Sequence, residues 1–284
     1  MKLDRFDLAD IHNPGVLASK VHALLGPLTS AVPVVEIALA LDIAKVRMER
    51  FDGFEGMLLT NAQRSTGGIL ANTTKGNRRA RFTVAHELGH FLMERHQLSD
   101  ENGFRCSARD MRETRAGRQN LKQETQANQF AISLLTPVSM VTPLLSPDPD
   151  LRDAQIMRDH LDVSLEACLR RMIAHRDEPL AAIWSHQGRV RYSIKGGGFP
   201  FVALKSGDQI PKGSSAHRAI TSGKAGFTGF ADTHPYPWTS RTNLELHEQT
   251  RVAANGHAVT LLWADIPEEN DDDGLAELGM PEFR

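Results

Sequence analysis

The chain has 284 residues and a formal net charge of −2, from 33 basic and 35 acidic side chains. This near balance excludes a strong overall attraction to nucleic acid or to an anionic membrane. No apolar run approaches the roughly 18 residues that a membrane span needs, and the two cysteines do not form a disulfide framework. Because the N-terminus lacks an apolar signal segment, we expect a cytoplasmic protein with room for two or three domains.

The residues before position 79 predict a small α+β layer. Val32–Leu41 has apolar side chains at helical spacing and predicts a short helix. Ala44–Phe51, Phe54–Thr60 and Gly68–Asn72 predict three strands of a small mixed or antiparallel sheet. The edge of such a sheet can bind an extended peptide as an added strand, and the sequence does not specify which strand does so.

A long helix is predicted at Arg79–Arg95, and it contains the pentapeptide His86-Glu87-Leu88-Gly89-His90. Two histidines four residues apart lie on one helix face and can bind one zinc ion, while Glu87 reaches a zinc-bound water. Gly89 costs about 1 kcal/mol relative to alanine in a helix interior, which favours the close approach of a second helix there. The alternative is an amphipathic helix with two surface histidines.

The third ligand is expected from a second predicted helix, Gln119–Leu135. Glu124 shares one face of this helix with small and apolar side chains. A carboxylate on such a face is costly to bury unless it is paired or bound to metal. Since a catalytic zinc takes three protein ligands and keeps one open position, we predict a Zn²⁺ site made by His86, His90 and Glu124, with Glu87 as the general base. The alternative is an exposed glutamate in the first helical turn, where the helix dipole favours it.

Two segments, in this order, resemble the ImmA/IrrE metallopeptidases. FTVAHELGHFL is followed by ETQANQFAISLLTP, and together they match the two family patterns from roughly Val32 to Pro137. The resemblance implies a small α+β, gluzincin-like zinc peptidase domain with the ligands and the general base named above. One departure is Thr136, which stands where a methionine is common before the proline.

The connection between the two predicted metal helices, His96–Arg118, is polar and rich in arginine. Contact with an acidic or phosphorylated partner is one interpretation, and a solvated surface is the favoured one. Cys106 is either a fourth zinc ligand that silences the enzyme or a small packing residue. The arginines of this connection are Arg105, Arg109, Arg112, Arg115 and Arg118.

Residues Leu151–His175 predict two helices joined by a short turn, with Ser164 as the N-cap of the second helix. The turn resembles a helix-turn-helix corner, and Arg170 and Arg171 are candidates for phosphate contact. Acidic side chains oppose them, so we expect packing against the peptidase rather than direct DNA binding. These acidic residues are Asp153, Asp159, Asp162 and Glu166.

From Pro179 onward the chain predicts a separate β-rich unit. Two hairpins are expected, the first with Gln187-Gly188 in its turn and the second with Asn255-Gly256 in a type I′ turn. This unit resembles the GAF-type sensor domain at the C-terminus of IrrE proteins, which leaves ligand sensing and a scaffold or oligomerisation role both open. The expected elements are strands at Leu180–Ser185, Arg189–Ile194, Asn243–Ala253 and His257–Ala264, with a helix at Ser214–Ser222.

We therefore expect a zinc metallopeptidase domain at residues 1–142, a helical segment at 143–178, a β-rich and GAF-like domain at 179–266, and an acidic flexible tail at 267–284. The oligomeric state is left open. Candidate donors to a tetrahedral oxyanion are His96, Arg105 and His160, and none is singled out. Asn128, one turn after Glu124, is expected either to orient that carboxylate or to pack between helices.

The expected function is metal-assisted hydrolysis of a peptide bond. The family resemblance implies a protein substrate, a cytoplasmic helix-turn-helix repressor whose cleavage derepresses stress, mobile-element or toxin–antitoxin genes. A non-proteolytic anti-repressor or DNA-binding regulator with a structural metal is the alternative, although a structural site has no use for Glu87. A housekeeping peptidase is a third reading, and two accessory regions count against it.

Overall fold

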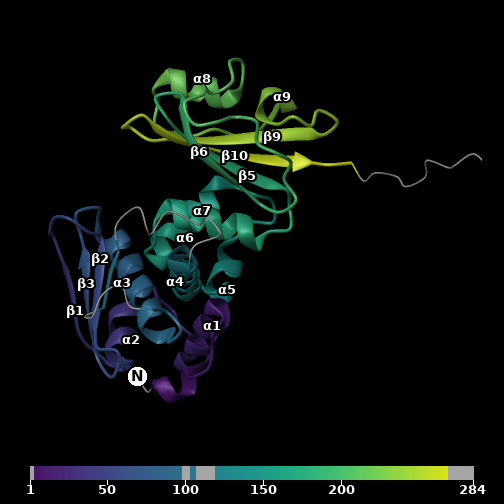
Figure 1. The fold of residues 1–284 in the computed structure, drawn as a ribbon. Helices are drawn as coiled ribbons and strands as arrows, with labels where there is room; N and C mark the ends of the chain where they lie inside the picture. Colours follow the sequence, from purple (N-terminus) through teal and green to yellow (C-terminus); the bar gives the residue numbers. More distant parts are fainter. Residues whose placement is uncertain (1–2, 98–102, 107–118, 268–284) are drawn as a thin grey trace, which may run out of the picture. The chain divides into compact units, whose positions relative to one another are not determined.

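The computed structural model describes residues 3–97, 103–106 and 119–267, and for 103–106 and 119–121 it describes only the backbone. The chain forms an α+β fold in two compact units, Met1–Arg176 and Asp177–Arg284 (Figure 1). Several predictions concern positions outside the described residues or side chains. They are those for Arg105, Cys106, Arg109, Arg112, Arg115, Arg118 and the acidic tail from residue 268 onward.

The first unit contains a four-stranded sheet in the order β1-β3-β2-β4. Its strands are β1 (Ile43–Glu49), β2 (Gly56–Thr60), β3 (Gly67–Asn72) and β4 (Gly103–Cys106). The β2–β3 hairpin inserts its second strand beside β1, so that β1 and β3 run parallel and the sheet is mixed rather than antiparallel. The short strand β4 lies in the segment that the sequence predicted to be a loop.

Two helices form the centre of the first unit. α3 (Asn77–Leu92) lies against β2 and β3, and α4 (Gln119–Leu135) packs on α3 (Figure 1). A Cβ atom at Gly89 of α3 would lie 2.9 Å from Cδ1 of Phe130 and 3.4 Å from Cα of Ala127, both in α4. The close helix approach predicted from this glycine is confirmed.

The sequence reading missed the N-terminal helix α1 (Pro14–Leu25), which packs on α4. Its start signal is regular: Asn13 Oδ1 accepts from the backbone N–H of Gly15 at 2.9 Å, and proline occupies the first helical position. His22 contacts the Leu134 carbonyl at 2.7 Å through Nε2, which ties α1 to the end of α4. The remaining short elements are η1 (Arg5–Leu8), α2 (Val34–Ala40), α5 (Val138–Val141) and η2 (Thr142–Leu144).

The predicted helix pair is present as α6 (Leu151–Leu161) and α7 (Leu165–His175). Ser164 caps α7, and its Oγ accepts from the backbone N–H of Ala167 at 3.1 Å. Asp162, in a left-handed conformation between the two helices, pairs with two arginines of α3. The distances are 3.0 Å from Arg78 Nε and 3.2 Å from Arg81 Nε.

The two arginines considered for phosphate contact have partners within the first unit. Arg170 pairs with Glu166 at 3.0 Å, one turn away on α7. Arg171 Nε donates to the Thr136 carbonyl at 3.1 Å, just after the end of α4. The helix pair thus contacts α3 and the residue that follows α4, in agreement with the expected packing role.

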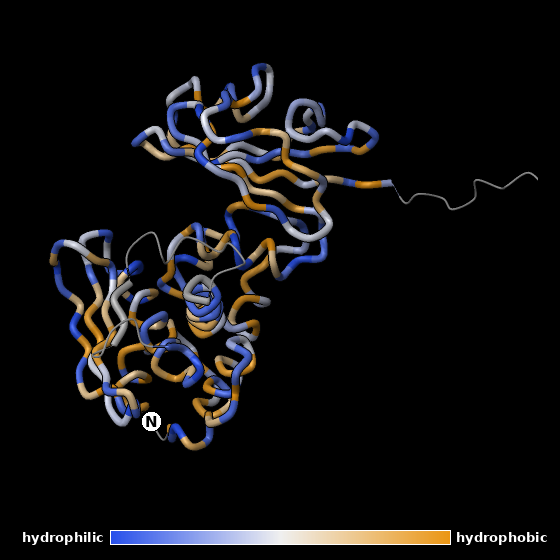
Figure 2. Tube along the Cα trace, viewed as in Figure 1, coloured by the Kyte–Doolittle hydropathy of each residue, from blue (hydrophilic) through white to orange (hydrophobic). Residues whose placement is uncertain are grey.

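The second unit is an antiparallel sheet in the order β6-β5-β10-β9-β7, with β8 also pairing with β9. A hydrophobic core that includes Phe199, Trp238 and Leu262 lies within this unit. Figure 2 shows apolar (orange) and polar (blue) stretches along the chain of this unit. The elements are β5 (Leu180–His186), β6 (Arg189–Lys195), α8 (Ser215–Ser222), β7 (Gly226–Phe227), β8 (Ala231–Thr233), α9 (Pro235–Trp238), β9 (Glu245–Val252) and β10 (His257–Asp265).

The two hairpin turns differ. Gln187 and Gly188 both have positive φ, 50° and 74°, as a two-residue type I′ turn requires. In the second turn Gly256 has a φ of 78° and donates its N–H to the Ala253 carbonyl at 3.1 Å, whereas Asn255 is not left-handed. The type I′ prediction is therefore wrong there: the connection is one residue longer, and only the last residue is left-handed.

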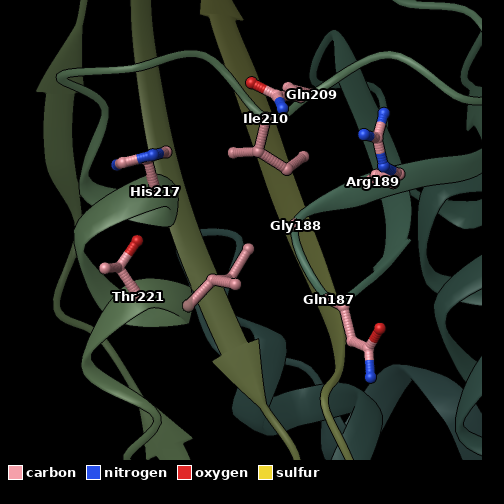
Figure 3. A pocket seen from close by; sticks show the side chains of 8 residues that line it. Gln187, Gly188, Arg189, Gln209, Ile210, His217 and Thr221 are labelled. Atoms are coloured by element: carbon pink, nitrogen blue, oxygen red, sulfur yellow. The ribbon is translucent and has the colours of Figure 1, made fainter.

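A cavity of about 430 Å³ lies between the β5–β6 turn and α8 (Figure 3). Arg189 and Gln209 lie on one side of it and His217 and Thr221 on the α8 side, around the apolar Ile210. Ligand sensing by this unit stays a prediction. Among the described residues, no helix combines the length and apolar character that a bilayer span requires.

Candidate metal centre

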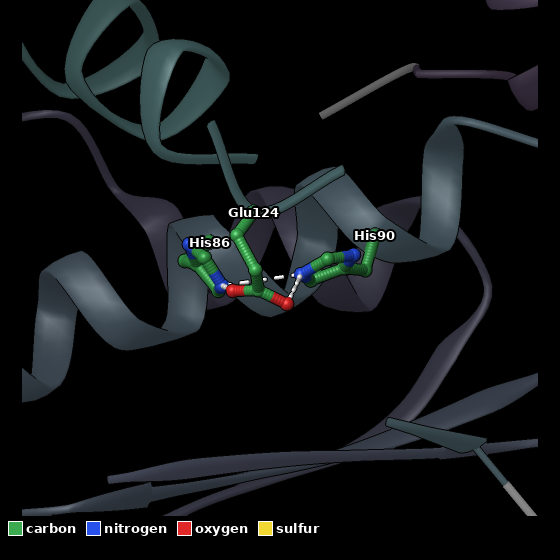
Figure 4. A group of neighbouring side chains, drawn as sticks. All are labelled: His86, His90 and Glu124. Atoms are coloured by element: carbon green, nitrogen blue, oxygen red, sulfur yellow. Dashed lines mark hydrogen bonds and ion pairs between the residues drawn. The ribbon is translucent and has the colours of Figure 1, made fainter. Parts of the chain in front are cut away.

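Helices α3 and α4 bring the three predicted ligands together (Figure 4). His86 Nε2 lies 3.2 Å from Glu124 Oε2, His90 Nε2 lies 3.3 Å from Glu124 Oε1, and the two Nε2 atoms are 3.1 Å apart. The side chains of His86 and His90 are fully buried, and that of Glu124 is 14% exposed. Among the described residues, these three form the group whose ligand atoms lie close enough together to hold one metal ion.

The other ring nitrogen of each histidine contacts a side chain of the surrounding structure. His86 Nδ1 lies 3.1 Å from Asn128 Oδ1, which is only an acceptor, so Nδ1 of His86 carries the proton. His90 Nδ1 lies 2.9 Å from Nδ1 of His96, and His96 Nε2 lies 3.2 Å from Gln126 Oε1. Because Gln126 Oε1 accepts, His96 donates through Nε2 and accepts from His90 through Nδ1.

Burial keeps the imidazoles of His90 and His96 neutral near pH 7. It lowers the pKa of His90 to about 4 and that of His96 to about 3. Burial acts to raise the pKa of Glu124, but the contacts with His86 and His90 outweigh it and lower the pKa, so the carboxylate is ionised. Two imidazole lone pairs and a carboxylate therefore face one another, and this arrangement is suited to a cation.

The spacing of the ligand atoms fits a tetrahedral ion. Ligand bonds of about 2.0–2.1 Å place neighbouring ligand atoms about 3.3 Å apart, and the three separations here are 3.1, 3.2 and 3.3 Å. Two histidines and one glutamate are also the donor set of a catalytic zinc site with one open position. The residues fit such an ion without rearrangement.

Glu87 is buried beside the ligands, against strand β2. A Cβ atom at Gly56 of β2 would lie 2.5 Å from Oε1 of Glu87 and would also overlap Thr83. The missing side chain at this position is what makes room for the Glu87 carboxylate. No sequence pattern singled out Gly56, because its role depends on the packing of β2 on α3.

Arg64 was also missed, and it holds the end of the metal helix. Its buried guanidinium donates from Nη1 to the carbonyls of His90 (2.9 Å) and Met93 (2.6 Å), and from Nη2 to the carbonyl of His96. The His90 carbonyl lies in the last turn of α3, and the carbonyls of Met93 and His96 lie beyond its end. Arg64 thereby fixes His90 and the backbone of His96 together, so that their rings meet.

Of the candidate oxyanion donors, His96 is used elsewhere, because both of its ring nitrogens have partners within the site. His160 is exposed near the end of α6. The side chain of Arg105 lies outside the described part of the chain. Asn128, considered as an orienting residue for Glu124, contacts His86.

Comparison with known proteins agrees with this geometry. Residues 43–172 match the model of the IrrE N-terminal-like domain, Peptidase M78. The chain carries an IrrE N-terminal-like peptidase domain. The matched range includes the three ligand residues and Glu87, and it continues through α6 into α7, beyond the end of the resemblance noted at Pro137. No curated protein matches the chain.

Among solved structures, a Mycobacterium tuberculosis transcriptional regulator is similar in fold, with a TM-score of 0.57 and 14% sequence identity. The similarity covers 92% of this chain and 80% of that one. At this identity the likeness concerns the fold, and it extends beyond the IrrE N-terminal-like domain into the second unit.

We expect Glu124→Ala to lower zinc affinity by at least about tenfold, since the variant keeps two of three protein ligands. The exposed Gln129→Ala on the same helix is the matched control and keeps full affinity. Zinc content after dialysis, measured by mass spectrometry, checks both. Full zinc occupancy of Glu124→Ala would remove Glu124 from the ligand set.

Proposed function

We propose that the chain is a zinc-dependent endopeptidase. The observation that carries this proposal is the convergence of His86, His90 and Glu124, together with the neighbouring Glu87 carboxylate, which is buried in the space that Gly56 leaves open. The IrrE N-terminal-like domain supports it, because that family is one of peptidases. A zinc ion in such a site acts as a Lewis acid on the scissile carbonyl and makes water acidic enough to lose a proton near neutral pH.

The side chains around the metal position transfer the proton and orient the ligands. Glu87 accepts the proton of the attacking water and returns it to the leaving amine. His86 and His90 are held in one tautomer by Asn128 and His96, which keeps their Nε2 lone pairs directed at the metal position. Because Glu87 is buried together with His86 and His90, bulk water is excluded from its carboxylate, and the electrostatic interactions of that carboxylate are stronger.

For the substrate, we propose a cytoplasmic helix-turn-helix transcriptional repressor, cleaved to derepress stress, mobile-element or toxin–antitoxin genes. The resemblance to ImmA/IrrE peptidases supports this, and the fold relative is itself described as a transcriptional regulator. The second unit, for which a GAF-like sensor is proposed, offers a place for an activating signal. A structural metal in a non-proteolytic regulator is disfavoured, since it leaves the buried Glu87 without a role.

We predict that Glu87→Gln retains zinc and fold but loses cleavage of the repressor by a factor on the order of 10²–10⁴, because a neutral amide cannot accept the proton. The assay is gel electrophoresis of a purified repressor encoded beside this chain, incubated with the zinc-loaded protein. Glu36→Gln, the same change on the exposed face of α2, is the matched control and cleaves normally. Equal cleavage by Glu87→Gln and the parent chain would refute the peptidase proposal.

A second prediction concerns Gly56→Ala. The added methyl group overlaps Thr83 and Glu87 and displaces the carboxylate, so we expect at least about a tenfold loss of kcat with zinc retained. Gly68→Ala in the adjacent strand is the matched control, because its nearest neighbour is the Lys45 carbonyl at 3.9 Å. Parallel measurement of zinc content and initial rates separates the two variants. Similar rates for both would show that Gly56 does not position Glu87.

A further inference from the structure

The outer edge of β2 is already paired with a segment of the same chain. β4 (Gly103–Cys106) runs antiparallel to it, with Cα partners Gly56↔Cys106, Met57↔Arg105, Leu58↔Phe104 and Leu59↔Gly103. This segment comes from the connection between the two metal helices. The outer edge of β2 is therefore not free in this structure, although β4 contributes only four residues to the sheet.

β2 is the strand that adjoins the reacting group. Gly56 is the position at which a Cβ atom would meet the Glu87 carboxylate, and it is paired with Cys106. The other edge of the sheet belongs to β1, with β3 lying between β1 and β2. Of the two edges, the one at β4 is thus the edge on the Glu87 side.

Strand spacing decides which position on this side suits a substrate. Neighbouring strands lie about 4.7–4.9 Å apart, so a peptide paired with β2 has its backbone one spacing from Gly56. A peptide added outside β4 would lie roughly 10 Å from Gly56, two spacings away. Only the first position brings a peptide bond next to the Glu87 carboxylate, and β4 occupies that position.

We propose that the outer edge of β2, residues 56–59, is the docking surface for an extended segment of the protein substrate, and that Gly103–Cys106 occupies it as an internal competitor. The inference rests on the proposed peptidase function. The partner it specifies is an unfolded or extended peptide that pairs antiparallel through backbone hydrogen bonds, with side chains giving further specificity.

Occupation of the β2 edge by β4 would keep the basal peptidase activity low. An attached segment acts at an effective concentration of the order of millimolar, so a free peptide competes poorly at micromolar concentration. Only substrates with contacts beyond the strand, or conditions that release β4, reach the site efficiently. The apparent affinity for a peptide is reduced by the fraction of molecules in which β4 is released.

The test uses the full chain with Glu87→Gln, so that bound peptide is not cut. The probe is a fluorescein-labelled peptide with the sequence of residues 101–108 and serine replacing its cysteine. Adding Phe104→Pro and Arg105→Pro removes both amide donors from the centre of β4, which a short edge strand tolerates. We expect the peptide to bind at least about tenfold more tightly to this variant, measured by fluorescence anisotropy, and a peptide of scrambled sequence to show no gain.

The binding position is read by crosslinking. A photoreactive benzoylphenylalanine at the peptide position equivalent to 105 should label Met57 and its neighbours in β2, as located by mass spectrometry. No gain in affinity, or labelling of β1 or of the second unit, would overturn the proposal. Since cleavage is not measured, failure here is distinct from failure of the peptidase function, which the Glu87→Gln rates report.

A reversible variant covers the case in which the prolines disturb folding. Met57→Cys with Arg105→Cys places a cysteine at each of two paired positions, whose spacing in a sheet suits a disulfide. With Cys106 and Cys168 replaced by serine and Glu87→Gln retained, oxidation should abolish crosslinking to β2 and reduction should restore it. Labelling of β2 to the same extent in both redox states would contradict the competitor role.

Discussion

The site depends on the close contact between α3 and α4 at Gly89. Phe130 and Ala127 of α4 approach this glycine so closely that a side chain there would overlap Phe130. The contact lets α4 bring Glu124 within 3.3 Å of Nε2 of His86 and of His90. Gly89 therefore lowers the stability of α3 but lets Glu124 reach the two histidines, because any larger residue would separate the two helices.

A second set of contacts fixes the positions of α3 and α4 relative to each other. Arg64 fixes the last turn of α3, and Asp162 between α6 and α7 pairs with Arg78 and Arg81 of the same helix. Arg171 of α7 reaches the end of α4. Helices α6 and α7 therefore support both α3 and α4, which gives a physical reason for the family match to extend to residue 172.

The convergence of His86, His90 and Glu124 could be predicted because it rests on local periodicity: the two histidines lie one turn apart, and Glu124 shares a helix face with mostly small and apolar side chains. The surrounding residues could not. Arg64 and His96 contact the end of α3 from irregular segments, and the spacing of residues in the sequence does not predict such contacts. Gly56 matters only through the packing of β2 on α3. The sequence left a mixed and an antiparallel sheet both open, and its type I′ prediction for the turn at Gly256 was wrong, since both features depend on how neighbouring strands meet.

The proposed peptidase activity requires a zinc ion bound by His86, His90 and Glu124, with its fourth position open. X-ray absorption at the zinc edge of the zinc-loaded chain tests it most directly. We expect nitrogen and oxygen neighbours at about 2.0–2.2 Å from the zinc and no sulfur. A sulfur neighbour at about 2.3 Å would mean that a cysteine closes the fourth position, and it would refute this ligand set.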